Sequence, residues 1–155
     1  MIEIRPARAE ELDAVWLLVR RAVAHMNELG NPQWGEDYPT RDFYADDLAR
    51  GELYAARSGG VLAGAACINT AEAPEYAPLP WATAPPAVVI HRMAVDPAFQ
   101  RQGVGRAFFA FAEELARQRV STSACRRSFS AGGLPRWARS VSTAGRCLTP
   151  ALKKP

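Results

Sequence analysis

A strand-like apolar run that leads through a glycine-containing loop into a helix constrains the fold more than any other part of the sequence. Residues 87–95 (AVVIHRMAV) are almost continuously apolar, which is typical of a central strand covered on both faces. Asp96 and Pro97 end the run, and apolar residues at helical spacing follow over 103–119. The loop between them directs successive backbone N–H groups at one point, beside the positive end of the helix dipole. This arrangement predicts an anion site, and in particular a pyrophosphate cradle.

The predicted cradle consists of this loop and the first turn of the helix. Its glycines matter because a Cβ would keep a phosphate away from the backbone, and its arginines add positive charge. A dinucleotide-binding loop is the competing interpretation, but that fingerprint requires a third glycine, and Phe108 stands in its place. The residues assigned to the cradle are Gln100, Arg101, Gln102, Gly103, Val104, Gly105 and Arg106.

The segments before this motif have equally clear periodicities. Alternating residues predict strands, spacings of three and four predict helices, and a Ser-Gly-Gly turn joins two strands as a hairpin. The order strand-helix-helix-strand-strand-strand-helix predicts a mixed α/β (α+β) domain with helices packed on a sheet. The predicted elements are strands 2–5, 53–56 and 61–69, helices 9–29 and Thr40 through Ala49, and a long loop over 71–87.

Several landmarks of this chain resemble the GCN5-related N-acetyltransferase (GNAT) superfamily. Gln100, Gly103 and Gly105 are similar to that family's acetyl-CoA signature, and Met93–Pro97 resembles its fourth strand and exit. The start of the first strand and the strands of the hairpin also resemble their counterparts in the family. These landmarks occur in the family's order along the chain. The resemblance covers residues 1–120 and implies a GNAT fold, a mostly antiparallel sheet flanked by helices.

The resemblance implies that the chain transfers an acetyl group from acetyl-CoA to a primary amine of a small molecule or peptide by direct attack. Main-chain groups of Met93, Ala94 and Val95 would hold the pantetheine arm and polarise the acetyl carbonyl. The partners implied are therefore acetyl-CoA and an amine acceptor. The alternative is a non-catalytic acyl-CoA-binding module, or an inactive truncated member of the family.

His91 is the candidate base, because the attacking amine must be neutral and histidine titrates near neutral pH. It precedes Met93 by two residues, which places both side chains on one face of a regular strand. The alternative interpretation is a histidine that merely fills a hydrogen-bonded slot beside the sheet.

The loop between the first two helices is the candidate acceptor site, since it lines the acceptor site in the GNAT family. Its aromatic and acidic groups, Trp34, Glu36, Asp37 and Tyr38, would suit a cationic amine. The alternative is a loop pinned to the core by its aromatic rings, with solvated carboxylates.

Residues 121–155 depart from the family. They contain seven Lys or Arg and no Asp or Glu, so the net charge of +3 belongs to this tail. The family's fifth strand is not recognisable there, nor is the tyrosine that serves as general acid, since all four tyrosines precede residue 77. Inserting one base before codon 120 in a back-translation restores a strand-like Gly-Leu-Asp-Val-Arg-Leu. We therefore expect a frameshift near codon 120, with a genuine basic tail that engages nucleic acid as the alternative.

Other function classes find little support in the sequence. The three cysteines are scattered without a CxxC pair, so no metal site is predicted. No run of 18 apolar residues occurs, and the N-terminus lacks a signal-peptide pattern, so no membrane partner and a cytoplasmic location are expected. Without a fifth strand, the apolar fourth strand would form an edge able to pair with another chain, which leaves a homodimer open.

Overall fold

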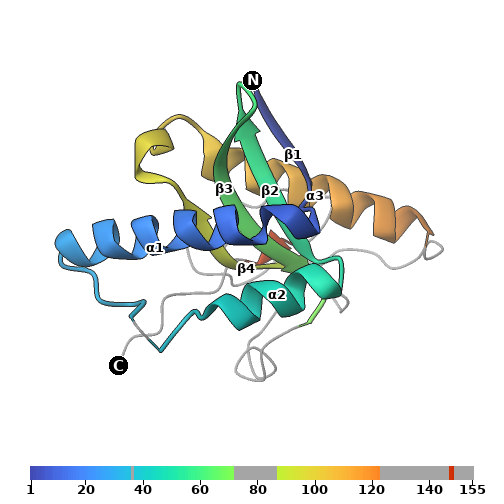
Figure 1. Cartoon of the computed structure of the whole chain (residues 1–155). Helices are drawn as coiled ribbons and strands as arrows, with labels where there is room; N and C mark the ends of the chain where they lie inside the picture. Colours follow the sequence, from blue (N-terminus) through green and yellow to red (C-terminus); the bar gives the residue numbers. More distant parts are fainter. Residues whose placement is uncertain (36, 72–86, 123–146, 149–155) are drawn as a thin grey trace, which may run out of the picture.

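The computed structural model describes residues 1–35, 37–71, 87–122 and 147–148, and in this part the strands form one sheet. Neighbours follow the chain order from β1 to β5, and the first four strands are antiparallel (Figure 1). The last strand is short and pairs in parallel with Val88 and Val89. The strands are β1 (Ile2–Pro6), β2 (Leu53–Ser58), β3 (Val61–Asn69), β4 (Val88–Val95) and β5 (Cys147–Leu148).

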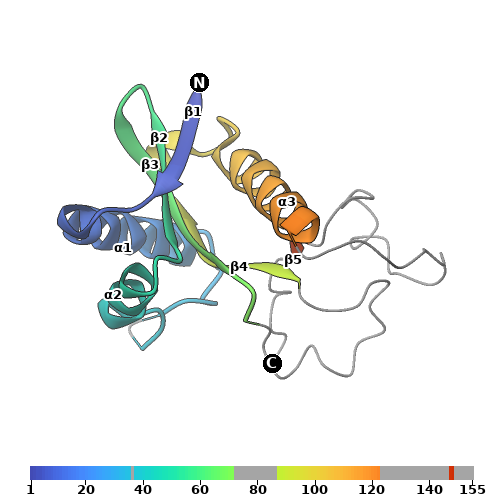
Figure 2. The same ribbon diagram turned by 90° about the vertical axis from the view of Figure 1, so that its right-hand side faces the viewer.

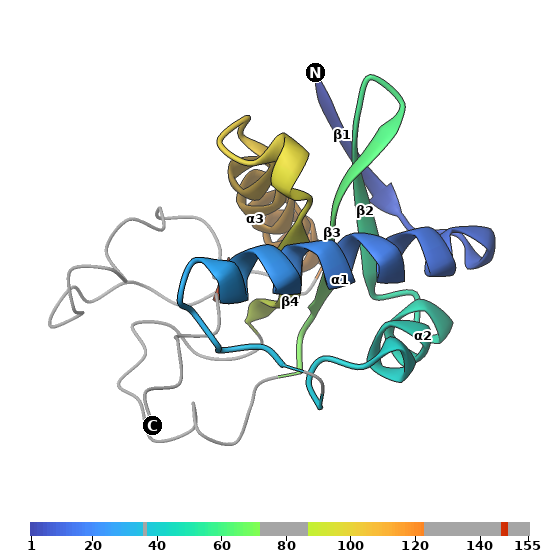
Figure 3. The ribbon, with the colours of Figure 1, turned by 60° about the vertical axis from the view of Figure 1, so that its left-hand side comes forward.

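Helices cover both faces of the sheet, as Figure 2 shows. Two of them, α1 (Leu12–Glu28) and α2 (Arg41–Ala49), lie on one face, and α3 (Val104–Thr122) lies on the other. Short 3-10 turns precede the first and last of these helices, η1 (Ala9–Glu11) and η3 (Pro97–Phe99). In Figure 3 the full length of α1 can be followed across the sheet from the side opposite α3. In the part of the chain that the structure describes, no helix is long and apolar enough to cross a membrane.

Each face of the sheet has its own apolar core. On the α3 side, Phe108 is fully buried against β2, β3 and β4. Gly64 of β3 allows this helix to approach closely, because a Cβ at that position would lie 2.9 Å from a methyl carbon of Val104 and 3.0 Å from a backbone oxygen of β4. On the other side, the core joins the inner faces of α1 and α2 to the sheet; it contains Val15, Leu18, Val19, Tyr44, Leu53, Ala65 and Ala94.

Glu11 ties the start of α1 to the edge of the sheet. Its carboxylate accepts hydrogen bonds from Arg5 at 2.7 and 2.8 Å, from Arg57 at 2.6 Å and from the Arg8 backbone N–H at 2.9 Å. These bonds lower the pKa of Glu11 to about 2, chiefly through Arg5, against the opposing effect of burial.

The register between β3 and β4 contains a bulge. Cys67 pairs with His91 and Ala65 pairs with Ala94, so two residues of β4 oppose one residue of β3. The first of these two, Arg92, has φ +48°, a left-handed conformation that is uncommon for residues other than glycine. The bulge lies directly before the segment that leads to the predicted cradle.

The order of elements predicted from the sequence is confirmed, and the hairpin strand over 61–69 has the predicted bounds. Two details differ. Thr40 occupies the N-cap position of α2, but its side chain makes no capping hydrogen bond. The expectation that the fourth strand is an uncovered edge is wrong at its first two residues, where β5 pairs with it. Residues 72–86 of the loop predicted over 71–87, and nearly all of the basic tail, lie outside the described residues.

Candidate functional site

The predicted cradle residues lie together on the loop between β4 and α3. Asp96 starts this loop and caps η3, since its side chain accepts a hydrogen bond from the Ala98 N–H at 3.0 Å. An ion pair with Arg21 of α1, at 2.5 Å, fastens the same carboxylate to the opposite helical layer. Further along, the Gln102 side chain donates to the Ala98 carbonyl at 2.8 Å. The loop is therefore held at its base while its outer residues stay exposed.

The backbone of the predicted cradle contains two residues in the left-handed region. Arg101 and Gly103 both have positive φ, +59° and +87°, just before α3 begins. A Cβ built on Gly103 would meet no atom within 4 Å, so its outer side is open to an approaching group. Gly105 is nearly as open, with the terminal carbon of Met93 3.9 Å from such a Cβ. The residues present therefore fit a phosphate, because the space that a side chain would occupy is free.

Positive charge surrounds this opening. Arg101 and Arg106 are exposed, and among the described residues neither forms an ion pair with a carboxylate. Unpaired arginines beside a helix N-terminus attract anions both through their own charge and through the helix dipole.

The side chains of Met93 and Val95 extend from β4 to the α3 side, where both pack against the core around Phe108. Ala94 between them is buried in the core on the α1 and α2 side. Beyond Val89, no strand in the described ranges pairs with the outer edge of β4. The main chain of this segment is thus next to both the cradle and an unpaired strand edge.

His91 lies on the opposite face of the sheet from Met93. Antiparallel partners share a face, so His91 shares the face of Cys67, whereas Val95 shares the face of Gly64, against α3. The expectation that His91 and Met93 point the same way is therefore wrong, because the bulge inserts an extra residue between them. A spacing of two residues would have been enough only in a regular strand.

The His91 ring is held in a hydrogen-bonded slot. Its Nε2 lies 3.1 Å from the Asn69 side-chain oxygen and 3.0 Å from the Ala71 carbonyl oxygen. Both partners are acceptors, so Nε2 carries the proton in the neutral ring and Nδ1 carries the lone pair. Burial lowers the pKa of His91, an effect that the bond to Ala71 partly opposes, and the ring is neutral at pH 7.

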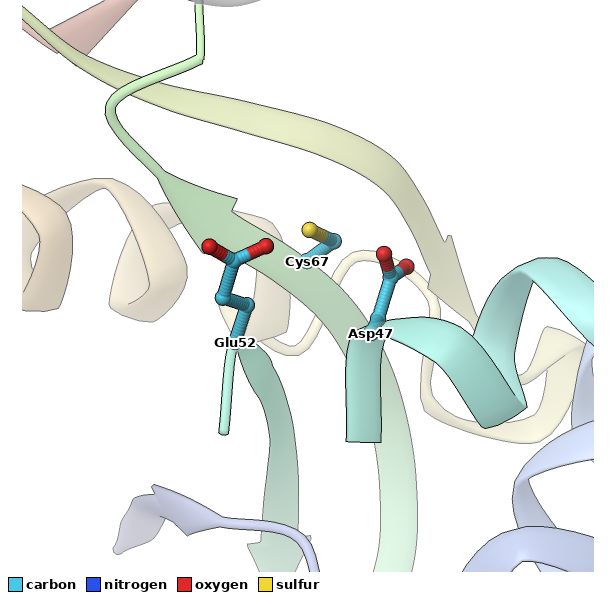
Figure 4. Close-up of side chains that lie close together, drawn as sticks. All are labelled: Asp47, Glu52 and Cys67. Atoms are coloured by element: carbon cyan, nitrogen blue, oxygen red, sulfur yellow. The ribbon is translucent and has the colours of Figure 1, made fainter. Parts of the chain in front are cut away.

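A second polar group, which no sequence pattern predicts, lies beside His91. Ligand-type atoms of Asp47, Glu52 and Cys67 all lie within 4.8 Å of one another, and Figure 4 shows these side chains converging from α2, from the residue before β2 and from β3. Guanidinium groups already satisfy the Asp47 carboxylate, from Arg50 at 3.0 Å and from Arg92 at 2.6 Å. Burial raises the pKa of Cys67 to about 12, which keeps the thiol protonated. The group is thus neutralised by protein cations.

The profile of the acetyltransferase (GNAT) family matches residues 21–131, which include β4, the cradle and α3. The chain belongs to this family. The match extends beyond residue 120, where the recognisable sequence resemblance ends, and the division into a 1–120 domain and a tail stays a prediction. No curated protein gave a significant match.

Solved acetyltransferases share the fold of this GNAT chain. A GNAT-family acetyltransferase from Streptococcus agalactiae is 28% identical, with a TM-score of 0.66 over 73% of this chain and 69% of that one. One from Listeria monocytogenes is 23% identical, with a TM-score of 0.60 over 74% and 69%. The PaiA N-acetyltransferase from Thermoplasma acidophilum, solved in complex with coenzyme A, is 14% identical, with a TM-score of 0.53 over 74% and 71%.

The candidate acceptor loop of this GNAT acetyltransferase is dominated by aromatic contacts. The rings of Trp34 and Tyr38 pack edge to face with their centres 6.3 Å apart, and the ring centres of Tyr38 and Phe43 of α2 are 5.5 Å apart. Trp34 also packs against the core on the α1 and α2 side. Asp37 is exposed, and Glu36 lies outside the described residues. The loop is thus pinned by its rings, as one of the two interpretations expects, while Tyr38 stays partly exposed.

Sequence reasoning missed Phe43 and Arg92 at this site. The Arg92 guanidinium lies 5.4 Å from the centre of the Phe43 ring, so a cation already occupies one aromatic face. Nothing in the strand-like pattern around residue 92 shows that its side chain turns toward α2, because only the bulge directs it there.

Proposed function

We propose that this GNAT acetyltransferase transfers an acetyl group from acetyl-CoA to a primary amine of a small molecule or peptide by direct attack on the thioester. The open backbone at Gly103, between exposed arginines and at the start of α3, is the observation that carries the proposal. It fits a pyrophosphate, the group that acetyl-CoA would place there.

The donor is bound by the loop and by β4. Backbone N–H groups from Arg101 to Arg106 hold the pyrophosphate, and the two arginine side chains add charge. Main-chain groups of Met93 and Val95 hold the pantetheine arm along the unpaired edge of β4. When bound, acetyl-CoA supplies an activated thioester carbonyl, and the N–H groups beside it stabilise the charge that develops on the oxygen.

The acceptor lies by the aromatic loop, with Trp34, Glu36, Asp37 and Tyr38 as its binding residues. His91 accepts a proton from the incoming ammonium group at Nδ1, because Nε2 is already a donor to Asn69 and Ala71. A lowered pKa keeps the ring in its basic form at neutral pH. The other interpretation gives His91 a purely structural role in its slot, in which case ordered water deprotonates the amine.

A non-catalytic acyl-CoA-binding module is the second candidate. It is favoured by one observation, namely that no tyrosine follows the cradle to protonate the leaving thiolate. Both candidates bind CoA, so binding does not separate them.

Release of free thiol from acetyl-CoA, followed with a chromogenic disulfide over a panel of amines, tests the proposal. Amine-dependent thiol release supports acetyl transfer. Tight CoA binding without release by any amine supports the binding module. Absence of CoA binding overturns both. The same assay on a chain in which one inserted base corrects codons 120 onward shows whether residues 121–155 limit turnover.

A further inference from the structure

Helix α2 holds one residue of β4 at two separate points. The Tyr44 hydroxyl donates a hydrogen bond to the main-chain carbonyl of Arg92 at 3.2 Å. The Asp47 carboxylate accepts from the side chain of the same arginine, from Nη2 at 2.6 and 2.7 Å and from Nε at 3.1 Å. Tyr44 and Asp47 are three residues apart, so they lie on the same face of the helix. The residue they hold is the first residue of the β4 bulge.

Both holding groups are fully buried, which makes these contacts hard to replace with water. Burial raises the pKa of Tyr44, so the hydroxyl keeps its proton and remains a donor at any working pH. Burial alone would lower the pKa of Arg92, but the hydrogen bonds and charge of Asp47 more than offset it and raise the pKa. Arg92 therefore keeps its charge, and the hydroxyl of Tyr44 keeps its proton, in these contacts.

Holding the carbonyl of Arg92 also orients the N–H of Met93. The two groups belong to one trans peptide plane, in which C=O and N–H point in opposite directions. With the carbonyl directed at Tyr44, the Met93 N–H must point away from α2. Arg92 itself has φ +48°, a conformation that non-glycine residues keep only where the surroundings enforce it.

We propose that Tyr44 and Asp47 are positioning residues that fix the 92–93 peptide so that the Met93 N–H is presented to the acetyl carbonyl of the donor. The inference rests on the proposed function, which assigns the main chain of Met93 to that carbonyl. Neither side chain touches the donor, and both act through Arg92. Their loss should therefore reduce the rate of transfer while leaving the affinity for CoA, which the cradle provides, unchanged.

The primary test replaces Tyr44→Phe, which removes only the hydroxyl. Tyr54→Phe is the matched control, because Tyr54 is also buried but packs on Phe111 in the other core. We expect Tyr44→Phe to lower kcat about tenfold, by misplacing one donor of the oxyanion site, with the Kd for acetyl-CoA within about twofold of wild type. The carbonyl 13C resonance of bound [1-13C]acetyl-CoA should also move upfield, because the carbonyl is less polarised. Tyr54→Phe should change none of these quantities.

Asp47→Asn provides a second variant that keeps the side-chain shape and removes the charge that orients Arg92. Glu11→Gln is its control, since Glu11 is another buried carboxylate held by two arginines, away from β4. We expect Asp47→Asn to repeat the loss of kcat and the upfield shift, and Glu11→Gln to lower stability only. Variants whose kcat and carbonyl resonance match those of their controls would overturn the inference.

Failure of the proposed function gives a different pattern. A wild-type chain that binds no acetyl-CoA refutes the donor site, and the peptide orientation is then read from the ligand-free protein. In that state the Met93 amide resonance and its hydrogen-exchange rate are compared between wild type and Tyr44→Phe. A changed resonance and faster exchange support the positioning role, and identical spectra overturn it.

Discussion

Substitution of Gly103 by alanine separates backbone strain from loss of ligand approach. Gly103 has φ +87°, and the added Cβ would meet no atom within 4 Å, so the variant suffers strain without a clash. A non-glycine residue in this region costs about 1–2 kcal/mol. The methyl group would also stand where the proposed pyrophosphate meets the backbone. Losing one hydrogen bond to that anion costs about 2 kcal/mol, which corresponds to roughly a thirtyfold weaker Kd.

Gly60 offers a control with nearly the same backbone. It lies in the turn between β2 and β3 at φ +82°, and a Cβ there also meets no atom within 4 Å. Gly60→Ala and Gly103→Ala should therefore lose similar free energies of unfolding, measured by urea denaturation. Calorimetric titration with CoA should show a weaker Kd for Gly103→Ala only. Equal CoA affinity in the two variants would refute the assignment of the cradle, whatever the stability data show.

Three further predictions concern the core, the edge of the sheet and the candidate base. Gly64→Ala should lower stability by about 2 kcal/mol through overpacking against α3, seen as a lower Tm, because the Cβ would lie 3.0 Å from a backbone oxygen; an unchanged Tm would contradict the close approach. Glu11→Gln should lower the free energy of unfolding by about 2 kcal/mol at pH 7. Because the pKa of Glu11 is lowered to about 2, the difference in this free energy between wild type and variant should shrink as pH falls from about 4.5 toward 2. If His91 is the base, the kcat/KM of the wild type falls as pH decreases through a pKa below 6.5. His91→Ala then loses most of its activity above that pKa. The same decrease of kcat/KM at low pH in both proteins would leave His91 a structural role.

Local patterns were sufficient to predict most of the fold. The hairpin between β2 and β3 follows from a turn made of Ser58, Gly59 and Gly60 between alternating segments, and the start of α3 follows from glycines after a buried strand. These signals lie within a few residues of one another. For the same reason the proposed cradle, whose groups are consecutive in sequence, is predictable from the sequence alone.

The bulge in β4 could not be predicted in this way. A strand with apolar residues on both faces has no alternation, so an extra residue at Arg92 leaves no mark on the pattern. The expectation that the His91 side chain lies on the same face as Met93 is wrong for this reason. The roles of Tyr44 and Asp47 were missed because their contacts cross 45 or more residues and depend on where α2 packs.

The extra residue in β4 also decides which side of the sheet each later residue serves. Because Arg92 is the residue that the bulge inserts, deleting it would restore regular alternation and leave Met93, Ala94 and Val95 on the faces that they occupy now. Flattening the bulge without removing a residue would instead carry Met93 and Val95 across to the α1 side and Ala94 toward α3. The bulge thus allows His91 to face α1 and α2 while Met93, two residues further along, faces α3 beside the cradle.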